Sequence, residues 1–330
     1  MKMRICLIGT FLAFAAGLVN AQTWTQAKWP IFLAPQARFG SAFTYDTFHQ
    51  NSPLFGGVGA SNLGPLTLGD TWMLTPAGWR KLSPVTSPSP RFGMMMGWDY
   101  VKGQGVMFGG GYFANNGVLF KNNETWVWDG TTWTQKFPAN SPSPRYLHVM
   151  VYDGARNQTV LFGGVTDAGY VADTWIWNGT TWTQVFPAHS PSPRAGGGFT
   201  YDATRNVSVL FGGVTPVASQ SDTWIWNGTD WVQLFPATVP PPRYAQGFQY
   251  DGAQNQSIMF GGTNEGGINL SDTWAWNGSN WVQQFPALIP TKRFYTQMTY
   301  DYSQGKLGMF GGGEGIKIGD VYLADTWLWF

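Results

Sequence analysis

The chain has 330 residues, of which 43% are hydrophobic and only 11% charged, and its formal net charge is +1 at neutral pH. A nearly neutral chain with so few charges lacks the basic surface that binding to nucleic acid or to anionic lipid requires. We therefore expect no nucleic-acid partner and no electrostatic attachment to membranes.

The first residues are typical of a cleaved signal peptide. Lys2 and Arg4 precede an apolar run, and Val19-Asn20-Ala21 places small residues at a cleavage position. The run is too short to span a bilayer and no second one follows, so we expect no membrane span. This interpretation gives a signal peptide at residues 1–21 and one domain at residues 22–330, which a bacterium would export to its periplasm or out of the cell. Cleavage would also remove Cys6, the only cysteine, so the mature chain could form no disulfide.

Three sequence markers then recur about every 50 residues. An arginine follows a proline-rich stretch six times, at intervals of 49 to 54 residues. The six arginines are Arg38, Arg91, Arg145, Arg194, Arg243 and Arg293. A Gly-Gly pair and an acid-Thr-Trp triplet keep the same period, with the triplets beginning at Asp70, Glu124, Asp173, Asp222, Asp272 and Asp325. Markers that stay in step through the chain indicate six structural repeats within one domain.

Each repeat contains four predicted strands, which the third repeat shows most clearly. Residues 146–153, 159–164, 173–178 and 180–186 are rich in Val, Ile, Tyr, Phe, Trp and Thr, which favour strands. Asn178-Gly179 separates the third strand from the fourth, and this dipeptide is the strongest short signal for a hairpin. The pattern predicts a four-stranded antiparallel sheet in every repeat.

A single sheet of this kind cannot cover both of its aromatic faces, whereas sheets stacked around an axis cover each other. All 19 tryptophans fall on repeat positions or their equivalents, which indicates packing between sheets and not a sugar-binding platform. The sixth repeat ends at Phe330 without a fourth strand, while Trp24-Thr25-Gln26 matches Trp133-Thr134-Gln135. We therefore predict an all-β, six-bladed β-propeller in which residues 23–29 complete the last blade and close the ring.

The Pro-Arg, Gly-Gly and spaced aromatic residues resemble the kelch repeat over essentially residues 23–330. The resemblance implies a kelch-type propeller of the galactose oxidase-like fold. Kelch propellers also include the sialic acid epimerase, plant specifier proteins and protein-binding modules, so the fold does not select a function. A copper site like that of galactose oxidase would need a cysteine crosslinked to a tyrosine, which a mature chain without cysteine cannot form. Because no other metal-ligand spacing is present, we predict no metal site and no cofactor.

Candidate functional residues lie in the loops that enter the first strand of each repeat and in those that join its second and third strands. Topology places both sets on one end of the propeller, called here the long-loop rim, and variable loops on a rigid scaffold usually carry function. Residues that depart from the repeat pattern are the better candidates there. For ligand binding, by stacking or through a carboxylate, we single out Tyr112, Tyr170, Asp167, Glu265, Glu314 and Tyr322.

His148 and the six arginines each allow two interpretations. His148 lies at the start of an inner strand, where it is either an ordinary strand residue or, if it faces the channel, an acid or base. Its possible partners in proton transfer are the rim acids Glu265, Glu314 and Asp320. The arginines either pair with the six acids of the third strands, which the equal numbers favour, or surround the channel mouth and hold an anion.

Three functions are compatible with these residues. The first is an exported recognition module that binds an extracellular or periplasmic glycan or protein through the long-loop rim. The second is a carbohydrate-active enzyme, of the epimerase or lyase type, that uses His148 and rim carboxylates. The third is a structural surface protein without a binding site. The sequence favours the first and leaves open whether the protein is an enzyme.

Overall fold

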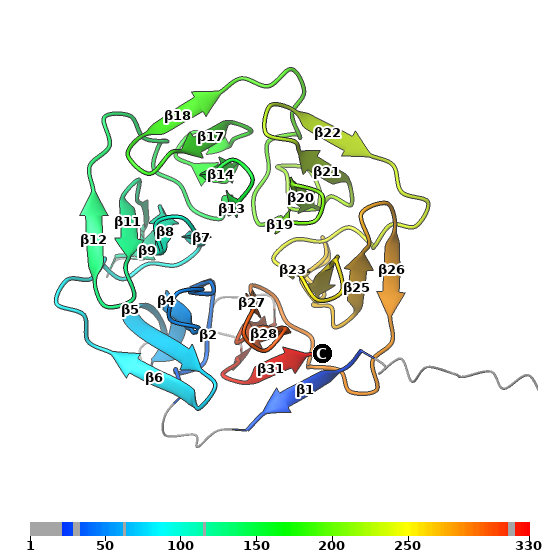
Figure 1. Cartoon of the computed structure of the whole chain (residues 1–330), viewed down its shortest axis with the longest axis horizontal. Coiled ribbons are helices and arrows are strands. Elements are labelled where there is room, and N and C mark those ends of the chain that lie inside the picture. The colour runs from blue at the N-terminus through cyan, green and yellow to red at the C-terminus, as the bar shows by residue number, and fades with distance from the viewer. Residues whose placement is uncertain (1–21, 29–33, 62–63, 115–116, 316–320) are drawn as a thin grey trace, which may run out of the picture.

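The computed structural model describes residues 22–28, 34–61, 64–114, 117–315 and 321–330. Within these ranges all regular elements are β-strands, and they form six blades around a central axis together with three small hairpins (Figure 1). Each blade is an antiparallel sheet whose first strand lies nearest the axis and whose fourth strand lies at the perimeter. The predicted six-bladed, all-β propeller is therefore confirmed. This part of the chain contains no helix with the length and apolarity to cross a bilayer.

The blades follow one another in chain order. The first contains β2 (Arg38–Phe39), β3 (Ala42–Phe43), β4 (Ser52–Ser61), β5 (Gly64–Thr75) and β6 (Gly78–Leu82), its inner strand being divided into β2 and β3. The second contains β7 (Met95–Asp99), β8 (Gln104–Phe108), β11 (Thr125–Trp128) and β12 (Trp133–Lys136). The third contains β13 (Val149–Asp153), β14 (Gln158–Phe162), β17 (Thr174–Trp177) and β18 (Trp182–Val185).

The fourth blade contains β19 (Gly198–Asp202), β20 (Val207–Phe211), β21 (Thr223–Trp226) and β22 (Trp231–Leu234). The fifth contains β23 (Gly247–Asp251), β24 (Gln256–Phe260), β25 (Thr273–Trp276) and β26 (Trp281–Gln284). The sixth contains β27 (Gln297–Asp301), β28 (Lys306–Phe310), β31 (Thr326–Trp329) and, as its outer strand, β1 (Trp24–Ala27).

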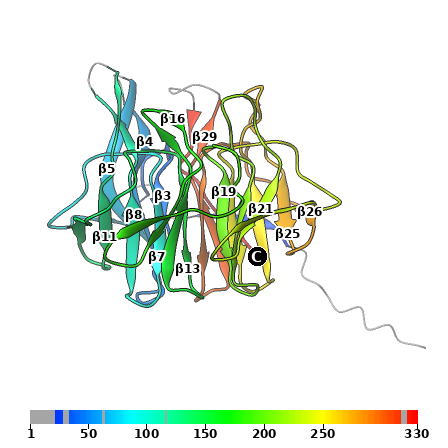
Figure 2. The ribbon, with the colours of Figure 1, turned by 90° about the horizontal axis from the view of Figure 1, so that it is seen from above.

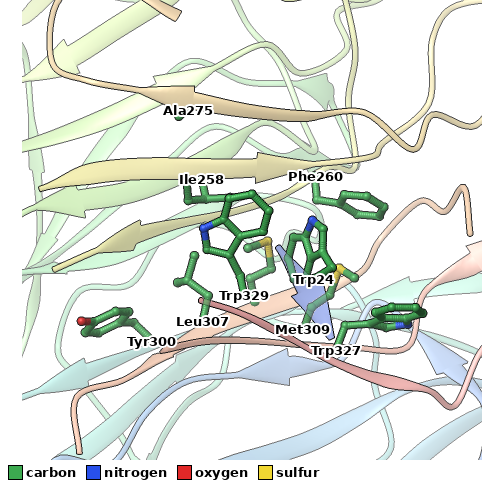
Figure 3. Close-up of a cluster of buried hydrophobic side chains, with 10 residues drawn as sticks. Trp24, Ile258, Phe260, Ala275, Tyr300, Leu307, Met309, Trp327 and Trp329 are labelled. Atoms are coloured by element: carbon green, nitrogen blue, oxygen red, sulfur yellow. The ribbon is translucent and has the colours of Figure 1, made fainter. Parts of the chain in front are cut away.

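The ring closes where β1 pairs with β31 in antiparallel register, Trp24 opposite Trp329 and Ala27 opposite Thr326. The two ends of the described chain thus share one sheet, as the incomplete sixth repeat predicts. Residue 29, the last of the predicted closing segment, lies outside the described residues. Figure 3 shows the closing side chain, Trp24, within the core between the last two blades. Its indole is 1% exposed and packs against Phe260 of the fifth blade and Trp329 of the sixth.

Tryptophans of the outer strands join each blade to the one before it. The indole nitrogen of Trp182 in the third blade donates a hydrogen bond to the Thr125 hydroxyl of the second blade at 2.9 Å. The same contact occurs in all six blades, and its other donors are Trp24, Trp79, Trp133, Trp231 and Trp281. The acceptors are the threonines of the acid-Thr-Trp triplets, which explains why this position keeps a hydroxyl. A buried indole N–H left unpaired would cost about 1–3 kcal/mol.

The Gly-Gly pairs allow the backbones of neighbouring blades to approach closely. Gly163 and Gly164 both have positive φ angles, of 67° and 102°. The amide of Gly164 donates to the Arg194 carbonyl of the next blade at 2.9 Å. A methyl group built on Gly163 would lie only 2.6 Å from that carbonyl oxygen, so a larger residue would separate the blades.

The long-loop rim carries extra hairpins that rise from the blades. They are β9 (Gly111–Phe113) with β10 (Leu119–Lys121), β15 (Val165–Thr166) with β16 (Gly169–Tyr170), and β29 (Gly313–Glu314) with β30 (Val321–Tyr322). Figure 2 shows β16 and β29 at the same end of the molecule. The loops around this end surround the mouth of the central channel.

Candidate functional site

A closed ring of backbone hydrogen bonds narrows the channel just below the long-loop rim. Each blade contributes one residue to this ring, the second after its repeat arginine. The backbone amide of each such residue donates a hydrogen bond, 2.7–3.2 Å long, to the backbone carbonyl of the equivalent residue in the preceding blade. All six residues have positive φ angles of 47–64°. We call them the constriction ring: Gly40, Gly93, Leu147, Gly196, Ala245 and Tyr295.

This ring also shortens the inner strands relative to the sequence prediction. The pattern of the third repeat predicts a strand from residue 146, whereas β13 begins at Val149. Leu147 has a φ of 55°, which is incompatible with extended backbone. A residue other than glycine in this left-handed region costs about 1–2 kcal/mol, and Leu147, Ala245 and Tyr295 all adopt it.

An aromatic bowl lies on the rim side of the constriction ring. Its wall consists of the residues that directly follow five of the repeat arginines: Phe39, Phe92, Tyr146, Tyr244 and Phe294. Tyr295 of the constriction ring lines its base, and Phe113 and Leu119 of the β9–β10 hairpin extend one side. The cavity measures about 400 Å³, at the lower end of the range of small-molecule sites.

The fourth blade leaves a gap in this aromatic wall. Its residue after the repeat arginine is Ala195, which is too short to reach the axis, and no residue of this blade lines the bowl among those described. The bowl is therefore asymmetric although the scaffold is a sixfold repeat. A binding site for a single asymmetric ligand requires this kind of departure from symmetry.

The polar groups of the bowl are uncharged, since no Asp, Glu, Lys, Arg or His lines it among the described residues. Burial, followed by the nearby Tyr170 phenol, raises the pKa of both Tyr146 and Tyr244. Burial likewise raises the pKa of Tyr295 well above its usual range. These hydroxyls therefore stay protonated at neutral pH, and within the described chain none of the three has a hydrogen-bond partner.

Asn269 adds an acceptor to the lining. Its Nδ2 donates to the Gly315 carbonyl at 2.8 Å, which fixes the orientation of the amide because a carbonyl can only accept. Its Oδ1 has no partner among the described residues, although the side chain is only 7% exposed. A buried acceptor without a partner is costly unless a ligand or water supplies the donor.

His148 lies below the constriction ring, in a narrow cavity of about 120 Å³ that follows the channel. The side chain is 1% exposed, its ring packs edge-on against Phe108, and neither ring nitrogen has a hydrogen-bond partner in the described part of the protein. Burial, reinforced by the charge of Arg145, lowers the pKa of His148 to about 3. The imidazole is therefore neutral, and the described residues of this cavity include no carboxylate to exchange a proton with it.

Tyrosines occupy the far end of the same channel. Tyr100 and Tyr302 both line the cavity that contains His148, and their rings meet edge-on with centroids 6.4 Å apart. Each packs in turn on a tyrosine of an inner strand, Tyr152 and Tyr300 respectively. With Tyr295 at the rim end, His148 is enclosed between aromatic groups at both ends of the channel.

The six repeat arginines lie in a buried network outside the bowl. Arg145 donates through both terminal nitrogens to the Asp173 carboxylate, at 2.7 and 2.8 Å, and also to the Gly163 carbonyl. Each of the other five likewise pairs with the third-strand acid of its own blade, and all six side chains are at most 3% exposed. Of their two interpretations, this geometry supports the structural one.

The rim residues singled out from the sequence lie around the bowl and do not converge on one point. Tyr170 lies near enough to Tyr146 and Tyr244 to raise the pKa of both phenols, after burial, but it does not line the bowl. Tyr322 is buried against Phe39, behind the wall. Tyr112 stacks on Phe120 within the β9–β10 hairpin, facing a separate groove toward the first blade.

The rim acids are likewise dispersed. Asp167 is 87% exposed and forms an ion pair with Lys121 at 2.7 Å. Glu265 is exposed in the loop before β25, and Glu314 is half-buried in β29. Asp320 lies outside the described residues. None of the three described acids lines the cavity that holds His148 or the bowl.

Sequence reasoning did not single out the five wall residues that follow the arginines, because they occupy repeat positions and therefore look like scaffold. The available signal was variation within the repeat. The position after the arginine reads Phe, Phe, Tyr, Ala, Tyr, Phe, and the next reads Gly, Gly, Leu, Gly, Ala, Tyr. Five of the six residues at the first position line the bowl and all six at the second form the constriction ring, so this variation is concentrated at one place in the fold.

The described residues contain no group of three or more His, Cys, Asp or Glu side chains that could hold a metal ion. No protein-family model matches the sequence, and no curated protein matches it either. Membership of the kelch family therefore stays a prediction.

Solved structures do match the fold. One is described as the structure of YjhT, with a TM-score of 0.67 and 14% sequence identity over 89% of this chain and 95% of that one. At this identity the similarity supports the shared fold alone.

Proposed function

We propose that this protein is an exported recognition module that binds an uncharged glycan in the aromatic bowl. The observation that carries this proposal is the lining of the bowl: aromatic walls, protonated tyrosine hydroxyls and no charged side chain among the described residues. Sugar rings present apolar C–H faces together with hydroxyl groups. Planar aromatic rings suit the first, and hydrogen-bonding groups such as the Tyr244 hydroxyl and Asn269 Oδ1 suit the second.

The absence of charged side chains among the described residues of the lining argues for a neutral ligand. A carboxylate or ammonium group entering this bowl would lose its hydration without meeting an opposite charge on any described residue of the lining, which is strongly unfavourable. The dimensions argue for a small group, since a typical protein partner covers about 800 Å² of each surface and not one recess of this size. Proton-transfer chemistry has less support, because His148 and the described rim acids lie apart.

Isothermal titration calorimetry tests the proposal. The probes are methyl glycosides of glucose, galactose, mannose and N-acetylglucosamine, with glucuronic acid and N-acetylneuraminic acid as charged comparisons. We expect at least one neutral glycoside to bind and both acids to bind more weakly. Tyr244→Ala should lower the affinity at least tenfold, because it removes one wall and one hydroxyl.

Tyr112→Ala is the matched control. It removes the same type of side chain from the same rim, but its ring stacks on Phe120 outside the bowl. The control should bind as the unmodified protein does. Failure of every neutral glycoside to bind, or equal losses in the two variants, would overturn the proposal.

A further inference from the structure

Tyr295 separates the bowl from the channel beneath it. It lines both cavities. A methyl group built on Gly196 would lie 3.5 Å from the Tyr295 hydroxyl oxygen, so the phenol reaches from the sixth blade to the fourth blade's member of the constriction ring. Gly40 and Leu147 of the constriction ring also line both cavities, and together with them the Tyr295 side chain closes the bowl from below.

The backbone at this position does not call for a tyrosine. All six members of the constriction ring have positive φ angles, three of them are glycine, and Tyr295 has a φ of 47°. Glycine adopts this conformation without strain, whereas a bulky side chain is a marked exception there. Strained residues of this kind persist only where the surrounding structure holds them in place, and they concentrate at functional sites.

Neighbouring aromatics hold the Tyr295 ring in place. It stacks on Phe39, with an interplanar angle of 22° and centroids 6.0 Å apart, and meets Phe294 edge-on at 5.5 Å. Both partners belong to the bowl wall. The ring is therefore a fixed base of the bowl, continuous with its sides.

A bowl closed at its base has one opening, on the rim. An internal segment of a polymer needs a way in and a way out, whereas the end of a chain needs only one. We propose that Tyr295 is the specificity-determining floor of the bowl and restricts it to the uncharged terminal sugar of a glycan. This inference rests on the proposed function and adds which part of the glycan is recognised.

A printed array of neutral glycans tests which part of the chain is bound. The hits of the unmodified protein should share their terminal sugar, whatever the internal sequence. Glycans that carry the same sugar only internally, or with its end blocked by a further residue, should give no signal. Hits that share an internal segment would overturn the proposal.

Variants at the constriction ring test the role of Tyr295 itself, by titration with the best hit of the array. Tyr295→Gly suits the positive φ and removes the floor, so the affinity should fall at least tenfold. Tyr295→Phe keeps the ring and should stay within about threefold of the original affinity. Ala245→Gly is the matched control: it has the same backbone conformation but lines only the channel, and it should bind normally.

The two proposals can fail separately. If the unmodified protein binds nothing on the array, the proposed function itself fails. If it binds glycans but Tyr295→Gly retains the original affinity, only the role of Tyr295 is refuted. Circular dichroism will show whether Tyr295→Gly folds. If it does not, the array pattern of the unmodified protein still tests whether the terminal sugar is recognised, and the Tyr295→Phe titration still tests the role of the ring.

Discussion

Lowering the pH from 7 to 5 should destabilise the folded protein by about 2 kcal/mol through His148 alone. Burial, and then the charge of Arg145, lowers the pKa of this imidazole from 6.5 to about 3. As the pH falls below 6.5, the unfolded chain therefore takes up a proton at His148 while the folded protein does not. Stability is lost at about 1.4 kcal/mol per pH unit until the pH approaches the folded pKa.

Substitution of His148 by methionine isolates this effect. The second blade has Met94 at the equivalent position, fully buried, so the side chain suits the site. Urea unfolding of both proteins at pH 7 and pH 5 gives four free energies of unfolding. The unmodified protein should lose about 2 kcal/mol more than His148→Met between the two pH values.

The same measurement bears on function. A difference below about 0.5 kcal/mol would mean that folded His148 titrates near its ordinary pKa. Such a group would have access to water or to a charged partner, which contradicts its enclosure in the channel. The interpretation of His148 as a proton-transfer group would then regain support.

Two further predictions concern the scaffold. Arg145 outweighs the effect of burial and lowers the pKa of the Asp173 carboxyl, so this pair should stabilise the protein above about pH 4 and lose its effect as the pH falls further. Asp173→Asn should lower the free energy of unfolding, measured in urea, by about 3 kcal/mol at pH 7 and by less at pH 3. The control Asp167→Asn, which removes an exposed ion pair, should lower it by less than about 1 kcal/mol. Trp24→Ala should destabilise the protein by about 3–5 kcal/mol and expose the closing strand to limited proteolysis, and unchanged protease resistance would contradict closure through β1.

The blade architecture could be predicted because its determinants recur within each repeat. Arg145, Asp173 and Gly163 lie in one blade and bond to each other, so each repeat carries its own set of markers. The closing strand could be predicted for the same reason, since Trp24 replaces the tryptophan that the sixth repeat lacks. The threonine of each triplet was visible as a marker, but its role as acceptor for the next blade's tryptophan was not.

The candidate site could not be predicted in the same way. The rim residues chosen for their departure from the repeat, such as Tyr112 and Asp167, lie apart from the bowl. The bowl is built instead from Phe39, Tyr146 and Tyr244, which are about 100 or 200 residues apart and stand at repeat positions. Only the variation among the six copies distinguishes them from scaffold.

By itself the sequence determined the number of blades, their four strands and the way the ring closes, because these depend on short-range patterns that repeat along the chain. The tertiary structure alone decided which residues meet at the axis. Closure of the ring brings the six inner strands together there, so that Tyr295 of the last blade reaches Gly196 of the fourth. It also encloses His148 in a cavity that no described rim acid lines. Proximity of this kind depends on the closed ring, which no single repeat contains.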